Sequence, residues 1–224
     1  MSATIPVTPR ERVTIRSTLP RLPIDKPPTL EILTERLRLR LLRSSDLDVL
    51  HIMRTQVEVM RWSVKGKPNE SIDITKKELD KMMSSPESLA FAICLKGTGE
   101  MVGIGGHHRR QGDLGWPTLF YTLRSEAWGN GYATEFLKAF LDHWWTLPRE
   151  EAEWPVDVSL ISGDGPIKDE LVMAATVLLN TASQGVMRKS GMVLTKIWEE
   201  EDLHKPGTGE LIQLLAFAQK KPTQ

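Results

Sequence analysis

The sequence is poor in cysteine, has no net charge and lacks a long apolar run. Cys94 is the single cysteine among 224 residues, so an internal disulfide is excluded and a reducing compartment fits. Basic and acidic residues each total 29, which gives no general attraction to nucleic acid or anionic lipid. No apolar run could span a bilayer, and the first residues lack the apolar core of a secretory signal. We therefore expect a cytoplasmic monomer or homodimer that engages neither membrane nor nucleic acid.

What the chain does have is the composition of a folded domain and one well-organised segment. Hydrophobic residues make up 40% of the chain and charged residues 26%, as is typical of a soluble globular protein. β-Branched and aromatic residues at 118–124 predict a strand, and Gly129 and Gly131 then predict a turn. An apolar stripe at helical spacing follows and predicts a helix that ends before Pro148. The stripe consists of Ala133, Phe136, Leu137, Phe140, Leu141 and Trp144.

This strand, glycine turn and helix start have the features of an anion-binding site. Glycines let a ligand approach the backbone, and the unpaired N–H groups of a helix start point toward it. A phosphate or pyrophosphate is the expected guest, although the glycines could instead do no more than shape a tight turn. The dinucleotide fingerprint G-x-G-x-x-G/A does not fit, because Thr134 stands where its last small residue belongs.

Two stretches stand apart from the regular pattern. Residues 1–30 combine prolines with basic residues, which predicts a flexible arm that is mobile or lies on the surface. Residues 147–169 exceed the usual length of a loop and predict an insertion. The remaining chain, residues 31–219, is expected to form a single domain.

Further regular elements are expected on both sides of the glycine turn. Alternating leucines and arginines at 34–42 predict a half-buried strand. Ser45 and Asp48 have capping-box spacing and begin the first of two expected helices. The other elements are predicted from apolar patterns and turn residues. They are helices at 45–62 and 71–83, hairpins at 89–106 and 193–218, and a central strand at 171–179.

The paired histidines and Asn180 each allow more than one interpretation. Adjacent strand residues point to opposite faces, so His107 and His108 cannot readily share an ion, and we expect no metal site. Contact with an acidic or carboxylate-bearing substrate is a second role open to one of them, and His107 is the candidate. Asn180 fits the N-cap of a helix that ends at Gly191.

Three segments resemble the GNAT superfamily of acyltransferases. A-W-G-N-G-Y-A-T-E resembles its acetyl-coenzyme A loop, whose pattern is Gln/Arg-x-x-Gly-x-Gly/Ala. Gly129 and Gly131 match the two small positions, whereas Glu126 departs from the first. T-E-R-L-R-L-R from Thr34 and N-T-A-S-Q-G-V-M-R-K-S-G-M from Asn180 resemble two further segments of one branch. That branch contains the ribosomal-protein N-terminal acetyltransferases.

The resemblance covers about residues 34–218 and implies both a fold and an activity. The fold would be α/β (α+β), with a mixed, mostly antiparallel twisted sheet, splayed central strands and flanking helices. The activity would be that of an N-acetyltransferase, which moves acetyl directly from acetyl-coenzyme A to a primary amine of a protein N-terminus, lysine or small molecule. The implied cofactor contacts are Leu123, Arg124, Trp128, Gly129, Asn130, Gly131, Tyr132, Ala133, Thr134, Asn180 and Ser183.

The resemblance also implies candidates for proton transfer and for contact with the acceptor. Ser183 would protonate the departing thiolate, and either Asp202 or Glu201 would accept the proton of the amine. The predicted helix pair would overhang the acceptor, so Trp62 would line that site or else serve as an apolar anchor. Two alternatives remain open: an acyl-coenzyme A sensor or scaffold of the same fold without turnover, and a protein-interaction domain that uses the basic arm and the tryptophans.

Overall fold

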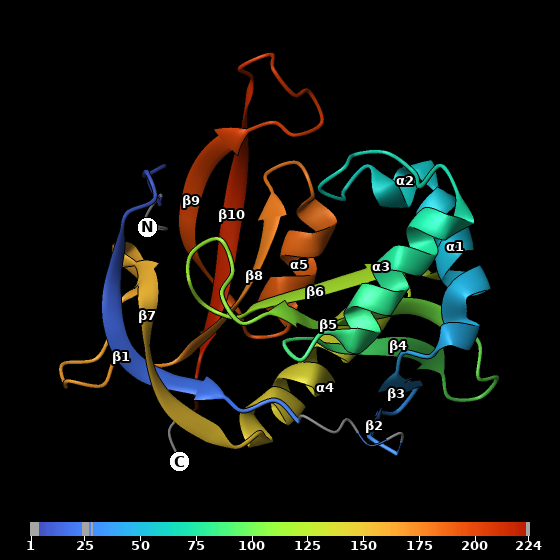
Figure 1. The fold of residues 1–224 in the computed structure, drawn as a ribbon, viewed down its shortest axis with the longest axis horizontal. Helices are drawn as coiled ribbons and strands as arrows, with labels where there is room; N and C mark the ends of the chain where they lie inside the picture. The colour runs from blue at the N-terminus through green and yellow to red at the C-terminus, as the bar shows by residue number, and fades with distance from the viewer. Residues whose placement is uncertain (1–4, 24–26, 28, 223–224) are drawn as a thin grey trace. The chain divides into compact units, whose positions relative to one another are not determined.

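The computed structural model describes residues 5–23, 27 and 29–222, which form two compact units (Figure 1). Unit 1 contains the described residues of Met1–Arg21, Arg109–Leu119 and Trp144–Gln224. Unit 2 contains the described residues of Leu22–His108 and Phe120–His143. Each unit has its own hydrophobic core, so each is described by itself.

Unit 2 is a sheet with helices on both faces. Its strands follow the order β2-β3-β4-β5-β6, and the ends of β5, β6 and helix α4 extend into unit 1. The strands are β2 (Glu31–Leu33), β3 (Leu37–Leu41), β4 (Leu89–Leu95), β5 (Met101–Arg109) and β6 (Thr118–Leu123). The helices are the short 3-10 helix η1 (Ser44–Asp46), α1 (Leu47–Thr55), α2 (Val57–Met60), α3 (Ile72–Ser84), the 3-10 helix η2 (Ser125–Ala127) and α4 (Tyr132–Thr146).

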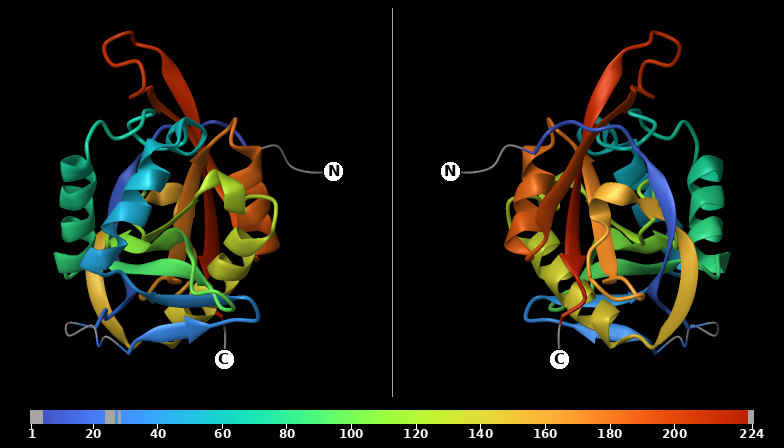
Figure 2. Two further views of the ribbon diagram at one scale, coloured as in Figure 1. Left: turned by 90° about the vertical axis from the view of Figure 1, so that its right-hand side faces the viewer. Right: turned by 90° about the vertical axis from the view of Figure 1, so that its left-hand side faces the viewer.

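Strand β4 separates the two faces because its side chains alternate. Ala92 and Cys94 belong to the core cluster that includes residues of α1 and α3. Phe91 points the other way and meets Phe140 of α4 edge to face, with ring centroids 5.9 Å apart. Figure 2 shows α1 and α3 on one side of these strands and α4 on the other. The free thiol of Cys94 is buried, as its place in an apolar strand predicted.

The first helical segment differs from the single helix expected at 45–62. Its capping carboxylate is Asp46, which accepts the backbone N–H of Arg43 at 2.8 Å, so the predicted capping pair of Ser45 and Asp48 is not used. The helix then breaks at Gln56, whose ψ of 116° is extended rather than helical. This break separates α1 from α2 and makes Gln56 the residue that joins them.

Unit 1 contains two sheets. The first residues of β6 continue into the order β6-β8-β10-β9, in which β6 and β8 are parallel and β8, β10 and β9 are antiparallel. Its elements include β8 (Leu171–Val177), α5 (Thr181–Lys189), β9 (Val193–Glu201) and β10 (Leu211–Lys220). With both parallel and antiparallel pairs and flanking helices, the predicted mixed, mostly antiparallel fold is confirmed.

The second sheet of unit 1 lies where the sequence predicted an arm and an insertion. Strands β1 (Arg12–Pro20) and β7 (Arg149–Asp157) pair antiparallel over their whole length, and Figure 1 shows them as one curved ribbon. Ile15 and Leu19 of β1 join the core of this unit, where they are 8% and 2% exposed. The short 3-10 helix η3 (Val158–Leu160) follows β7. Of the predicted arm, residues 1–4, 24–26 and 28 lie outside the described residues.

A buried lysine fixes the segment before β1 to the same unit. The Lys196 ammonium, on β9, lies 3.0 Å from each of the Asp157 carboxylate, the Thr8 hydroxyl and the Pro9 carbonyl. Its side chain is 2% exposed, so the ion pair is shielded from water. A buried charge is tolerated only when it is paired and hydrogen-bonded, and here residues 8 and 9 supply two of the partners.

We predict that the β1 segment is needed for stability, contrary to what its composition suggests. Leu19→Ala should lower the free energy of unfolding by about 2–4 kcal/mol, because it empties a packed core position. Val13→Ala is the matched control, since Val13 lies on the same strand and is 45% exposed. Urea unfolding measures both variants. Equal stability of the two would mean that β1 contributes little to the core.

Candidate functional site

The glycine turn between β6 and α4 adopts the conformation that a helix-start anion site needs. Gly129 and Gly131 have φ of +77° and +79°, which residues with a side chain rarely adopt. The helix begins at Tyr132, and the first helical hydrogen bond runs from the Glu135 N–H to the Gly131 carbonyl at 3.1 Å. The N–H groups that precede Glu135 therefore have no acceptor within the helix. We call residues 124–134 the cofactor loop.

The outer side of this loop is open. A Cβ atom added to Gly129 would meet no atom within 4 Å. A Cβ on Gly131 would lie 3.4 Å from a terminal nitrogen of the Arg36 guanidinium, which is ordinary contact. Both glycines are thus required by their backbone angles and not by crowding.

The cofactor loop also holds itself in shape. The Trp128 indole N–H donates to the Leu123 carbonyl at 2.9 Å, and the Asn130 side-chain amide donates to the Trp128 carbonyl at 3.0 Å. The Arg124 N–H donates to the Val102 carbonyl of β5 at 3.0 Å. The backbone groups of two residues that the resemblance implies as cofactor contacts, Leu123 and Arg124, are therefore already paired. A ligand that approaches the Leu123 carbonyl would meet the indole of Trp128, which is 44% exposed.

The carboxylate of Glu135, in the first turn of α4, accepts hydrogen bonds from residues just before β3. One carboxylate oxygen accepts the Thr34 hydroxyl at 2.6 Å and the Arg36 N–H at 2.8 Å. The other accepts the Arg36 Nε–H at 2.7 Å. Partial burial alone would raise the pKa of Glu135, but these hydrogen bonds outweigh it and hold the pKa below its usual value. Glu135 is therefore an anion at neutral pH.

Arg36 reaches from this carboxylate to the cofactor loop itself. A terminal N–H donates to the Asn130 carbonyl at 2.9 Å, and the guanidinium lies 4.9 Å from the centroid of the Tyr132 ring. Its side chain remains 46% exposed. Arg36, Tyr132 and Lys96 also line an open hollow of about 460 Å³. The sequence alone does not single out Arg36, whose only signal is its place within T-E-R-L-R-L-R.

Glu126 takes the position where the resembling pattern has Gln or Arg, and it has a partner of its own. The Gln56 side-chain amide donates to both carboxylate oxygens of Glu126, at 2.8 and 2.9 Å. The Gln56 carbonyl oxygen accepts the N–H of Ser125 at 2.9 Å. These bonds from Gln56 lower the pKa of Glu126. The break between α1 and α2 thus places one residue against the start of the cofactor loop, which sequence reasoning missed.

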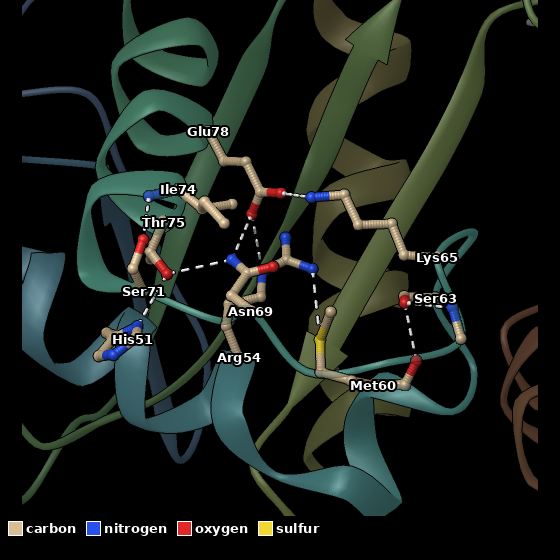
Figure 3. Close-up of polar contacts among 11 residues, drawn as sticks. His51, Arg54, Met60, Ser63, Lys65, Asn69, Ser71, Ile74, Thr75 and Glu78 are labelled. Atoms are coloured by element: carbon tan, nitrogen blue, oxygen red, sulfur yellow. Dashed lines mark hydrogen bonds and ion pairs between the residues drawn. The ribbon is translucent and has the colours of Figure 1, made fainter.

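A polar network holds the segment between α2 and α3 (Figure 3). Glu78 of α3 accepts hydrogen bonds from Lys65 at 2.7 Å and Asn69 at 3.0 Å, and Arg54 of α1 lies 3.7 Å away. Burial lowers the pKa of Arg54, and the nearby Glu78 opposes that shift. The buried Asn69 amide also donates to Thr75. These contacts therefore hold the segment between α2 and α3 in place.

The two acceptor-site candidates lie in different environments within unit 2. Trp62, just after α2, is partly exposed and its ring lies 4.4 Å from the Arg61 guanidinium carbon. This placement is that of a surface aromatic residue and not of an anchor buried between helices. His107 of β5 is 1% exposed, so its ring belongs to the packed core and is not an open contact for a substrate. Among the described residues, no group of three metal-ligating side chains occurs.

The N-x-x-S segment of unit 1 forms a helix cap. Asn180 precedes α5, and its side-chain oxygen accepts the N–H of Ser183 at 3.1 Å. This is the geometry of an N-cap, as predicted. Ser183 is partly exposed in the first turn of α5. The spacing of asparagine and serine therefore has a structural reason, whatever else the two residues do.

The two candidate bases belong to the turn between β9 and β10. A carboxylate oxygen of Asp202 accepts the His204 N–H at 3.0 Å, and one of Glu201 accepts the Gly207 N–H at 3.0 Å. The Glu201 side chain is exposed, and Asp202 is partly exposed. Both carboxylates stabilise the turn, and neither is enclosed in the way that would prepare it as a base.

Solved structures with a similar fold include three acetyltransferases. A GNAT-family acetyltransferase from Bacillus anthracis is 20% identical, with a TM-score of 0.65 over 86% of this chain and 99% of that chain. A protein assigned as a ribosomal-protein-serine acetyltransferase from Vibrio cholerae is 16% identical, with 0.57 over 86% and 98%. Spermidine N-acetyltransferase from Vibrio cholerae, solved with CoA and spermine, is 15% identical, with 0.63 over 84% and 97%. At such identities the likeness establishes the fold.

No curated protein matches the chain. None of the described helices is both long and apolar enough to cross a membrane.

The family is established by a match to the sequence. The family described as "Acetyltransferase (GNAT) domain" matches residues 36–193, which is more than half of the chain and includes the cofactor loop and Asn180. The chain therefore belongs to the GNAT acetyltransferase family.

Proposed function

We propose that this protein is an N-acetyltransferase that uses acetyl-coenzyme A and acts on a primary amine. The observation that carries the proposal is the cofactor loop, with two left-handed glycines directly before α4 and an open outer side. This loop lies within the segment that matches the GNAT family. The N–H groups at the start of α4 would bind the pyrophosphate, helped by the positive end of the helix dipole.

The chain's own residues have distinct tasks in this proposal. Acetyl-coenzyme A supplies the acetyl group as a thioester, and the amine takes it directly, without a covalent enzyme intermediate. Gly129 and Gly131 admit the pyrophosphate, and Asn130 and Trp128 hold the loop in the conformation that receives it. Ser183 would donate a proton to the thiolate that leaves. Because an amine is mostly protonated near neutral pH, a base or a chain of waters has to remove its proton before attack.

The candidate acceptors fall into three classes of amine: a protein N-terminus, a lysine and a small amine. The segment between α2 and α3, which would meet the acceptor, contains the partly exposed Trp62 and is held by the hydrogen bonds of Lys65 and Asn69 with Glu78. Acetylation of a panel that contains N-terminal peptides, lysine peptides and polyamines would rank these classes.

One observation favours a second candidate, a protein that binds acyl-coenzyme A as a sensor or scaffold. Asp202 and Glu201 both serve the β9–β10 turn, so neither expected base is prepared for proton transfer. Tight binding of acetyl-coenzyme A without release of coenzyme A across the amine panel would establish this alternative.

Our prediction for the cofactor loop is that Gly131→Asn weakens acetyl-coenzyme A binding by at least about tenfold, or 1.4 kcal/mol. Asparagine tolerates a left-handed conformation better than most residues, so the change mainly adds a side chain where phosphate would approach. Gly99→Asn is the matched control, because Gly99 has a similar φ of +75° and a Cβ added there would meet no atom within 4 Å. Calorimetric titration measures the affinities. Unchanged binding by a folded Gly131→Asn variant would overturn the assignment of the loop.

For proton transfer, we predict that Ser183→Ala lowers turnover by about 10²-fold while acetyl-coenzyme A still binds. Asp202→Asn separates the two roles of that residue. If Asp202 is the base, this change removes the base and turnover should fall about 10²-fold. If Asp202 only stabilises the turn, turnover should not change, because the asparagine oxygen can still accept the His204 N–H.

Turnover across a pH series, on an acceptor found with the panel, measures these variants. Wild-type turnover by Ser183→Ala would remove it as the acid. If Asp202→Asn is unchanged and Glu201→Gln is slow, the base is Glu201.

A further inference from the structure

A negative charge follows the cofactor loop directly, in the first turn of α4, close to where a phosphate would bind. Glu135 is in the first turn of α4, and its own N–H makes the first helical hydrogen bond with Gly131. Its carboxylate is ionised at neutral pH, because the hydrogen bonds that it accepts hold its pKa below the usual value. A carboxylate at a helix start stabilises the free helix, yet it repels a phosphate that approaches the same N–H groups.

Arg36 is placed to cancel this charge. Its Nε–H donates to Glu135 at 2.7 Å, and one of its terminal nitrogens also lies 2.7 Å from the same carboxylate oxygen. The other terminal nitrogen donates to the Asn130 carbonyl, so the guanidinium spans from the carboxylate to the loop. Beside Gly131 the group stays open to solvent. The positive charge therefore lies next to both the carboxylate and Gly131, where a phosphate would approach the backbone.

We infer that Arg36 is the counter-ion that makes the cofactor loop receptive to phosphate, by neutralising Glu135 and by facing the open side of Gly131. This inference rests on the proposed function, because the phosphate belongs to acetyl-coenzyme A. It explains how the loop functions although Glu126 stands where the family pattern has Gln or Arg. Glu126 is held by Gln56 and Arg124 is paired with Glu100, so the cation beside the start of α4 comes from a distant part of the chain.

The competing explanation is that Arg36 only braces the loop mechanically. The two explanations differ in what Glu135 does once Arg36 is gone. If Arg36 is a counter-ion, its removal exposes a repulsive charge, and removing that charge as well restores binding. If Arg36 is a brace, loss of Glu135 breaks the same contact and cannot compensate. Glutamine at position 135 keeps an oxygen that can accept the Thr34 hydroxyl and the Arg36 N–H.

The test is calorimetric titration of the full chain with acetyl-coenzyme A. Arg36→Ala should weaken binding by at least about tenfold, and Glu135→Gln alone should leave binding equal or tighter. The double variant Arg36→Ala/Glu135→Gln should recover at least half of the loss on a logarithmic scale. Arg36→Lys should bind nearly as wild type, because it keeps the charge. The matched control is Arg38→Ala, which removes an arginine that is also 46% exposed and paired with Glu31.

Ionic strength gives a readout that a brace would not affect. Screening shortens the reach of charge from about 8 Å at 0.15 M to about 3 Å at 1 M salt. The ratio of dissociation constants between Arg36→Ala and wild type should therefore shrink as salt rises. A constant ratio, a double variant no better than Arg36→Ala, or weak binding by Arg36→Lys would each overturn the inference. If the wild type does not bind acetyl-coenzyme A at all, the proposed function fails first and the inference fails with it.

Discussion

The carboxylate of Glu135 is the interaction on which the arrangement of the candidate site depends. It accepts the Thr34 hydroxyl and both the backbone and side-chain N–H groups of Arg36, which lie about a hundred residues earlier in the chain. Bringing such distant segments together costs chain entropy, which the packing of the sheet and α4 has to offset. In the folded chain, the carboxylate of Glu135 then fixes the start of β3 and the start of α4 relative to each other. The cofactor loop between β6 and α4 then has little freedom at its helical end.

The other end of the cofactor loop is fixed by Gln56 in a comparable way. The side-chain NH₂ group of Gln56 donates to both carboxylate oxygens of Glu126, and its side-chain oxygen accepts the N–H of Ser125. A single neutral side chain therefore pairs with one donor and two acceptors of the loop. Gln56 lies at the point where the helix breaks and separates α1 from α2. The geometry of the helix pair is thus connected to the geometry of the loop. The departure from the family pattern at Glu126 is accommodated by a change elsewhere in the chain.

Sequence reasoning was most successful where a pattern is local. The apolar stripe of α4, the glycine turn and the cap at Asn180 depend on neighbours within a few residues, and each was predicted. The pairing of β1 with β7 was missed, because each strand alone looks like a polar arm or loop. Their complementarity is visible only when the two are compared: Arg16 pairs with Glu151, and inward residues such as Ile15 and Trp154 alternate with charged ones. Contacts over such separations leave weak signals in a single sequence.

The two kinds of glycine in unit 2 show why a motif needs structure before it indicates a function. A side chain at Gly103 or Gly105 would collide with β6 or with Phe136, so those glycines are explained by packing. Gly129 and Gly131 meet no such obstacle and are explained by their positive φ. Gly99 has the same two properties in an ordinary hairpin turn, so neither property alone indicates a ligand. What distinguishes the cofactor loop is that a helix with unpaired N–H groups begins immediately after it, next to an arginine whose charge offsets the one carboxylate in that turn.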